Sequence, residues 1–171
     1  MTSNKPQQSL SSELDHIIKE IKELSNQTIY ENFQSSLSQY PFLVGSASGK
    51  EKLILFSSDY RFYREFKKNW SSSIFYVELT PQKNPQMDQW FHRYPQLLGV
   101  FYVTGKGTAR ILNQLKTPIK AKLLVVNSTH PGVIKDPHLF RAVININAKN
   151  YFSGSWLSKT LKKSEITSAH Q

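Results

Sequence analysis

Residues 97–104 read LLGVFYVT, and a Gly-Lys-Gly turn separates them from a second apolar run, KLLVV, at residues 122–126. Between the two runs, Gly107–Leu115 has the pattern of a short helix that ends before a Thr-Pro pair. A strand, a helix and a strand in this order form a β-α-β unit with parallel strands. Strands that are apolar along their whole length are typical of a sheet covered on both faces. The stretch therefore predicts an α/β domain.

The same alternation continues on both sides of this unit. Further strands are predicted at Phe42–Val44, Lys52–Ser57 and Ser73–Leu79, and further helices at Tyr60–Trp70, Pro85–Tyr94 and Ser155–Lys163. The segment 138–146 is compatible with a helix or a strand, and we favour a strand for its β-branched second half, 142–146. The predicted fold is a three-layer α/β domain with a mainly parallel sheet of four to five strands and a helical N-terminal extension.

The predicted domain organisation has four parts. They are a disordered tail at residues 1–11, the helical extension at 12–39, the α/β domain at 40–164, and a second disordered tail at 165–171. In the extension, Ser12 begins a helix that ends near Asn26, and a second helix begins at Thr28. One face of the first helix carries Leu14, Ile17, Ile18, Ile21 and Leu24. This face either packs on the domain or contacts a protein partner.

Positive charge is concentrated in the C-terminal part of the chain. The net charge of the protein is +10, of which residues 1–99 contribute +1 and residues 100–171 contribute +9. Such asymmetry is typical of a surface that meets nucleic acid, an anionic membrane or an acidic protein, and the alternative is a solvated face that maintains solubility. The chain has no Cys, no signal peptide and no run near the ~20 apolar residues of a membrane span. We therefore expect a soluble, cytoplasmic protein without a membrane partner.

One candidate anion site and one candidate basic surface follow from the motifs. A glycine-containing turn between a strand and a helix presents backbone amides at the carboxyl edge of a parallel sheet, where phosphates bind; this site comprises Gly105, Lys106, Gly107, Thr108 and Arg110. The alternative is an ordinary strand-to-helix turn. Lys and Arg residues predicted to form a basic surface suited to phosphates are Arg61, Arg64, Lys67, Lys68, Lys116, Lys120 and Lys122. The alternative there is a solvated outer face.

No catalytic constellation is recognisable in the sequence. The five His residues lack the spacing of metal ligands, and no Gly-x-Ser-x-Gly motif is present. Asp59 follows a predicted strand, and the cap of the next helix explains it most simply. We predict no catalytic residue, no metal and no cofactor.

Three segments resemble the psi subunit of the bacterial DNA polymerase III clamp loader. They are Lys52–Asp59 (KLILFSSD), Tyr76–Pro81 (YVELTP) and Leu123–Ile144 (LLVVNSTHPGVIKDPHLFRAVI). The chain departs from the family pattern because its first Trp is Trp70 and no Leu-Trp pair follows Arg141. The resemblance implies a non-enzymatic accessory subunit in DNA replication whose N-terminal segment is the main contact.

These observations together predict a non-catalytic binding or adaptor protein with a protein partner, a nucleic-acid partner or both. The alternative is a small α/β enzyme that binds a nucleotide or another phosphate ligand at the carboxyl edge of the sheet.

Overall fold

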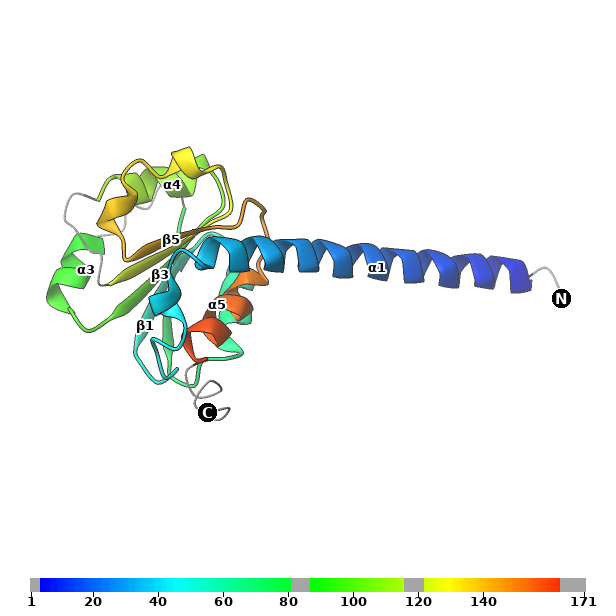
Figure 1. Ribbon diagram of the computed structural model, residues 1–171, viewed down its shortest axis with the longest axis horizontal. Coiled ribbons are helices and arrows are strands. Elements are labelled where there is room, and N and C mark those ends of the chain that lie inside the picture. The colour runs from blue at the N-terminus through cyan, green and yellow to red at the C-terminus, as the bar shows by residue number, and fades with distance from the viewer. Residues whose placement is uncertain (1–3, 81–86, 116–121, 164–171) are drawn as a thin grey trace.

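The computed structural model describes residues 4–80, 87–115 and 122–163, and Figure 1 shows a parallel sheet covered by helices with one long helix extending from it. Lys116, Lys120 and the predicted tail at 165–171 lie outside these ranges. Within them, five parallel strands are ordered β2-β1-β3-β4-β5. The strands are β1 (Leu53–Ser57), β2 (Ile74–Glu78), β3 (Leu98–Val103), β4 (Leu123–Asn127) and β5 (Ala142–Asn145). The predicted α/β fold with a mainly parallel sheet is confirmed.

The strand order defines where the chain reverses its direction of travel across the sheet. From β1 the chain moves to the edge strand β2 and then crosses back to place β3 on the other side of β1. Loops that leave β1 and β3 therefore diverge at the carboxyl edge, which is the usual ligand crevice of doubly wound folds. Every residue of β1 and β4 is buried, as their apolar sequences predict, whereas β2 is only partly buried.

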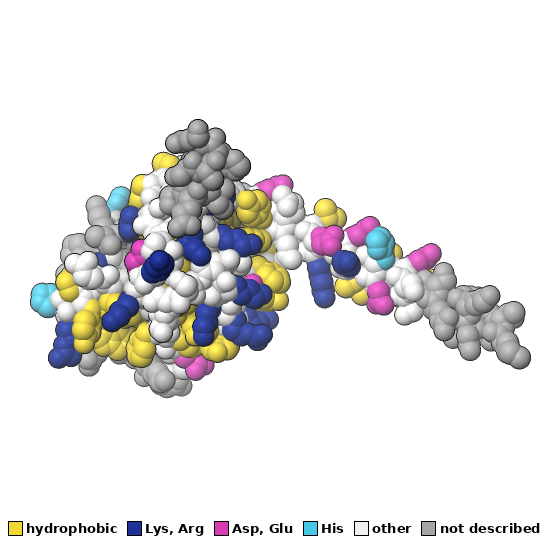
Figure 2. Space-filling view, turned by 90° about the horizontal axis from the view of Figure 1, so that it is seen from below, with side chains coloured by type: hydrophobic (Ala, Val, Ile, Leu, Met, Phe, Trp, Pro, Cys, Tyr) yellow, Lys and Arg dark blue, Asp and Glu magenta, His cyan; other side chains and the backbone are white. Residues whose placement is uncertain are grey.

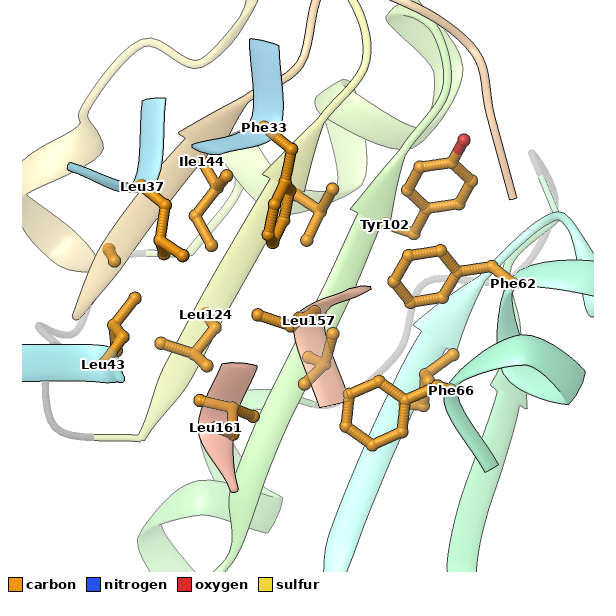
Figure 3. Close-up of a cluster of buried hydrophobic side chains, with 14 of the residues drawn as sticks. Phe33, Leu37, Leu43, Phe62, Phe66, Tyr102, Leu124, Ile144, Leu157 and Leu161 are labelled. Atoms are coloured by element: carbon orange, nitrogen blue, oxygen red, sulfur yellow. The ribbon is translucent and has the colours of Figure 1, made fainter. Parts of the chain in front are cut away.

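Helices cover both faces of the sheet and bury two apolar clusters. On one face lie α2 (Tyr60–Lys67), α5 (Ser153–Leu161) and the end of α1 (Asn4–Leu37). The other face is covered by α3 (Met87–Arg93) and α4 (Lys106–Asn113). Figure 3 shows the first cluster, in which the rings of Phe62 and Tyr102 stack with centroids 4.3 Å apart. Both clusters are continuous with the sheet, so the domain has the predicted three layers.

The N-terminal extension is one continuous helix where the sequence indicates two. Helix α1 passes through residue 11, the predicted end of a disordered tail, and through Asn26, the predicted break. Asn has only a weak preference against helix interiors, so other contacts override it. Here the Asn26 side chain accepts a hydrogen bond of 3.2 Å from Asn150 of the domain. Downstream of this contact, Phe33 and Leu37 are buried in the core.

Two shorter segments show how local chemistry decides between structures. Pro41–Leu43 forms a 3₁₀ turn instead of the predicted strand, because Pro has no backbone N–H for a ladder and suits the first helical position. The favoured strand at 142–146 is confirmed as β5, which pairs with β4 from Leu124 to Asn127. A single 3₁₀ turn at Pro137–Leu139 precedes it.

Candidate functional site

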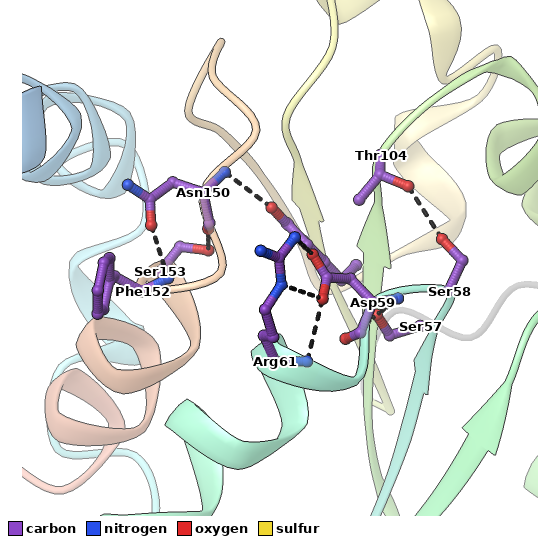
Figure 4. A network of polar contacts seen from close by, with 9 residues as sticks. Ser57, Ser58, Asp59, Arg61, Thr104, Asn150, Phe152 and Ser153 are labelled. Carbon is purple, nitrogen blue, oxygen red and sulfur yellow. Dashed lines mark hydrogen bonds and ion pairs between the residues drawn. The ribbon is translucent and has the colours of Figure 1, made fainter.

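The carboxyl edge between β1 and β3 holds a dense network of polar contacts, shown in Figure 4. The Ser57 hydroxyl accepts the Asp59 amide at 2.8 Å and donates to the Asp59 carbonyl at 2.9 Å. In the neighbouring loop, the hydroxyls of Ser58 and Thr104 lie 3.0 Å apart and join the end of β1 to the end of β3. The loops that diverge at this point are therefore tied to each other by their own side chains.

Asp59 and Arg61 neutralise each other at this edge. Asp59 Oδ1 accepts the Arg61 amide and Nε at 3.0 Å each, and Oδ2 accepts Nη2 at 3.0 Å. The bond to the amide is the predicted helix cap of α2. Hydrogen bonding to the Asp59 carboxylate holds the pKa of Arg61 above its ordinary value. The guanidinium also lies 4.7 Å from the centre of the Tyr151 ring, so it contacts a carboxylate and an aromatic ring of the protein while its side chain stays 63% exposed.

Tyr102 anchors the connection that follows β5. Its phenol oxygen accepts the Asn150 amide at 3.0 Å, and the ring is only 1% exposed. Burial raises the pKa of Tyr102 to about 12. The phenol is therefore neutral over the physiological range and acts here as a fixed hydrogen-bond partner. Farther along the same edge, the Asn127 amide donates to the Asn145 side chain at 2.8 Å and ties β4 to β5.

The predicted anion site is partly occupied by a side chain of its own turn. Thr108 Oγ1 accepts the amides of Thr104 and Gly105 at 3.1 and 3.3 Å and donates to the Gly105 carbonyl at 3.0 Å. Two amides at the start of this turn thus point inward. Lys106, Gly107 and Arg110 are exposed at the surface. Binding of an anion by this set stays a prediction.

The residues of the predicted basic surface separate in space. Arg61 lies at the carboxyl edge, and Arg64 is exposed along α2. Lys67 and Lys68 lie at the end of α2, and Lys122 lies just before β4. These last three lie at the opposite, amino edge of the sheet. Lys122 directly precedes a strand there, and Lys67 and Lys68 end a helix that returns the chain to that edge.

Other cations that sequence reasoning did not single out join them at the amino edge. With Lys67, Lys68 and Lys122, the described residues of this basic edge are Lys50, Lys52, Arg93, Arg141, Lys162 and Lys163. Figure 2, seen from below Figure 1, shows many Lys and Arg side chains over the domain and acidic side chains gathered on α1. A usable sequence signal was present, since Lys52, Lys122 and Arg141 each immediately precede an apolar strand.

A groove of about 600 Å³ opens beside the basic edge, on the sheet face that α3 covers. Its walls come from the starts of β1 and β2, from α3 and from the segment before β3. The lining residues are Lys52, Leu53, Ile54, Ser72, Ser73, Ile74, Phe75, Trp90, Tyr94 and Leu97. Phe75 is 64% exposed and Tyr94 is 50% exposed, which makes the groove markedly aromatic. No sequence pattern predicted it, because its walls come from four separate segments.

The apolar face of α1 is exposed over the outer part of the helix. The predicted partner residues Leu14, Ile17, Ile18, Ile21 and Leu24 are between 48% and 68% exposed, and Leu10 extends the stripe at 59%. Farther along the helix, Ile29 and Phe33 are buried against the domain. The alternative in which this face packs on its own domain is therefore wrong.

Comparisons with known proteins give no family for the chain: it matches no protein-family model, and a search of curated proteins finds no similar sequence. Within the described ranges, no helix combines the length and hydropathy needed to cross a membrane. In the same part of the chain, no three His, Asp or Glu side chains gather as ligands for a metal ion. What the protein does is therefore inferred from its own surfaces.

Proposed function

We propose that the protein is a non-catalytic adaptor that docks on a protein partner through the outer part of α1. The observation that carries this proposal is the exposed apolar stripe formed by Leu10, Leu14, Ile17, Ile18, Ile21 and Leu24. These positions repeat at the three- and four-residue spacing of one helix face. At 1.5 Å per residue, the twenty or so residues before Leu24 extend about 30 Å, and Figure 1 shows this part of α1 reaching away from the domain.

The stripe is unusual for a chain that works alone. Soluble monomers rarely leave large aliphatic side chains contiguous and exposed, because burying each one stabilises a structure by about 1.5–3 kcal/mol. Between Leu10 and Leu24, where the side chains are described, the large aliphatic side chains are each about half exposed or more, so they contribute little to holding the domain together. A partner that covers the stripe explains why the helix face is apolar.

The inner part of α1 fixes the direction of the projecting part. Ser36 Oγ accepts the Asn145 amide at 2.8 Å, and the rings of Tyr30 and Trp156 meet edge-on at 5.4 Å. Together with the buried Phe33 and the Asn26 contact, these interactions attach the helix to β5 and α5. A helix attached in this way presents its stripe in a preorganised orientation, which lowers the entropy cost of docking.

The charges beside the stripe indicate the chemistry of the partner. Residues 10–25 contain four acids, Glu13, Asp15, Glu20 and Glu23, and two lysines, Lys19 and Lys22. We therefore expect an apolar groove with a basic rim, into which the helix inserts. Two copies of this helix would bring acidic flanks together, so self-association is less favoured. A protein partner that docks on the N-terminal helix also agrees with the psi-subunit resemblance, which implies that the N-terminal segment is the main contact.

The decisive experiment compares the wild-type chain with the triple variant Leu14→Ser, Ile17→Ser and Ile21→Ser. A partner captured by the wild type is purified and its affinity is measured by titration calorimetry against both proteins. We expect the triple variant to bind at least tenfold more weakly, since three anchors of the docking face are lost. Its thermal midpoint should stay close to the wild-type value, because these side chains do not pack on the domain.

The matched control is the double variant Lys19→Ala and Glu23→Ala, which alters exposed residues of the same helix and keeps the stripe. It should retain the affinity within about threefold, as rim charges contribute little. Equal affinity of the triple variant and the wild type would reject the proposal. A concentration-dependent dimer in sedimentation that the triple variant abolishes would instead assign the stripe to self-association.

Ligand binding at the carboxyl edge has less support. There Arg61 is paired with Asp59, and Thr108 takes up two amides of the candidate anion turn. A phosphate would have to compete with these internal contacts.

A further inference from the structure

We propose that the basic edge and its aromatic groove bind single-stranded nucleic acid. In this arrangement, phosphates contact the lysines and arginines of the basic edge, and bases stack on Phe75 and Tyr94. The surface lies on the domain and not on the projecting part of α1, so this inference is independent of the proposed adaptor function.

The topology of the sheet explains why the cations meet. In a parallel sheet all strands begin at one edge, and the helices that follow them return to that edge. Lys52, Lys122 and Arg141 precede β1, β4 and β5 directly. Lys67 and Arg93 end the helices α2 and α3. Residues that are far apart in the sequence therefore form one surface.

Lys163 apart, the cations of this edge have few ion-pair partners among the described acids. Glu65 pairs with Lys68 at 2.8 Å. Glu51 accepts the amides of Ser48 and Gly49 at 2.9 and 3.0 Å; burial acts to raise its pKa, but these hydrogen bonds lower it overall. Among the described residues, Lys50, Lys52, Lys67 and Arg93 are exposed and form no ion pair with an acid.

Helix dipoles account for only part of this excess. Cations at the ends of helices are stabilised by the negative pole, which explains Lys67, Lys68 and Arg93 without any ligand. Lys50, Lys52 and Arg141 lie outside the α-helices, and the same explanation does not apply to them. Their common feature is the edge they share.

The groove supplies flat apolar platforms next to these charges. Phe75 pairs in register with Ile54, so it lies on the sheet face covered by α3, but on the edge strand β2 it is left largely uncovered. Tyr94 follows α3 and lies beneath the Arg93 guanidinium, which is 5.9 Å from its ring centre. Lys52 lines the groove itself. Aromatic rings and cations therefore occur in one continuous surface.

This combination favours single strands over other anionic partners. Unpaired bases expose their faces and stack on aromatic side chains, whereas the bases of a duplex are already stacked. A purely apolar peptide would leave the cations without a role, and an acidic peptide would leave the exposed rings without one. Single-stranded nucleic acid uses both features of the surface.

The test is fluorescence anisotropy with a labelled oligothymidylate of about 20 nucleotides, titrated with the full chain over a salt series. We expect binding that weakens steeply with salt, and a duplex of equal length and polyglutamate should compete poorly. Phe75→Ala and Tyr94→Ala should each weaken binding about tenfold at constant salt, because each removes one stacking platform. Lys52→Gln should make the salt dependence shallower by about one ion.

Three controls separate this site from the rest of the molecule. Tyr60→Ala removes a similarly exposed ring, 54% exposed and at the carboxyl edge, and should leave binding unchanged. Lys106→Gln removes a cation from the carboxyl edge and should have no effect beyond a small loss of net charge. The α1 triple variant should bind the oligonucleotide as the wild type does, so failure of one proposal is distinguishable from failure of the other.

Two results would overturn the inference. One is an absence of binding at low salt. The other is binding that polyglutamate and duplex compete for as well as the single strand does, with Phe75→Ala and Tyr94→Ala unaffected, since this marks a general attraction of polyanions. The thermal midpoints of the Phe75 and Tyr94 variants should remain near that of the wild type, which excludes unfolding as the cause of weaker binding.

Discussion

At the carboxyl edge of the sheet the polar side chains are bonded to one another, whereas five cations of the amino edge are exposed to solvent: Lys50, Lys52, Lys67, Lys68 and Arg93. Doubly wound folds commonly bind ligands at the first of these edges, where loops diverge at the switch in strand order. In this protein the polar groups at that edge bind other parts of the chain instead: Asp59 binds Arg61, and Tyr102 binds Asn150. The usual location of a binding site in a fold therefore does not determine where a given chain carries its exposed cations and rings.

The largest expected effect at the carboxyl edge concerns the packing of α5 against α2. A Cβ added at Gly154, at the start of α5, would lie 2.5 Å from the Phe62 carbonyl oxygen of α2 and 3.1 Å from the Phe66 nitrogen. Because the obstacle is backbone, Gly154→Ala should lower the free energy of unfolding by about 2–3 kcal/mol, although Ala favours a helix. Urea denaturation measures the loss. Lys159→Ala, on the exposed side of the same helix, should change stability by less than about 0.5 kcal/mol.

If Gly154→Ala were as stable as the wild type, α2 and α5 could move apart without lowering the free energy of unfolding. The carboxyl edge would then be easier to open than its contacts indicate, and the contrast between the two edges would weaken.

The next effect concerns the Asp59 carboxylate. Asp59→Ala removes the side-chain cap of α2 and the partner of Arg61, and should cost about 1–2 kcal/mol. The matched control is Asp136→Ala. Asp136 precedes the 3₁₀ turn at Pro137–Leu139 without a side-chain cap bond, so its loss should be nearly neutral. Equal losses for the two variants would mean that the Asp59 network does not hold this edge.

The strands were predictable because their chemistry is local. Leu98–Val103 and Leu123–Asn127 are apolar throughout, and burial on both faces is the simplest way to accommodate such runs. The order of the strands was not predictable, since it depends on which crossovers pack best across the whole sheet. The predicted break between two helices at Asn26 was wrong for the same reason. The side chain of Asn26 contacts Asn150, 124 residues away, and no local pattern can predict such a contact.

The candidate surfaces were predictable to different degrees. The stripe from Leu14 to Leu24 follows from helical spacing alone, and only its exposure had to come from the structure. Along the sequence, the change from a nearly neutral to a strongly basic part of the chain was placed near residue 100. In space the boundary lies at the end of α1, because residues 1–40 hold five acids and three Lys, net −2, while residues 41–171 hold nineteen Lys and Arg and seven acids, net +12. The groove of Phe75 and Tyr94 needed the fold to bring its walls together.

A third prediction uses alkaline pH to probe the buried phenol of the carboxyl edge. The folded-state pKa of Tyr102 is raised to about 12, above the ordinary value of 10, so between these values the unfolded chain loses a proton that the folded protein keeps. Stability is therefore fully present below pH 10 and falls as pH rises toward 12, by roughly 1 kcal/mol near pH 10.5. Tyr102→Phe should make this slope shallower in urea denaturation, while the part that comes from Tyr76, whose pKa burial also raises to about 12, remains. An unchanged slope would mean that water reaches the phenol and that the edge is less closed.

The smallest expected effect on stability lies at the amino edge. Phe75→Ala should change the free energy of unfolding by only about 0.5 kcal/mol, because the ring is 64% exposed on an edge strand and buries little area. The matched variant is Phe56→Ala on the neighbouring strand and the same face, where the ring is fully buried and its loss should cost about 3–5 kcal/mol. Thermal and urea denaturation of the pair measure the contrast. A large loss of stability for Phe75→Ala would show that the groove is part of the core. A small loss would show that the fold does not need this exposed ring for stability. The ring would then be available, together with Lys52 in the same groove, to contact a ligand.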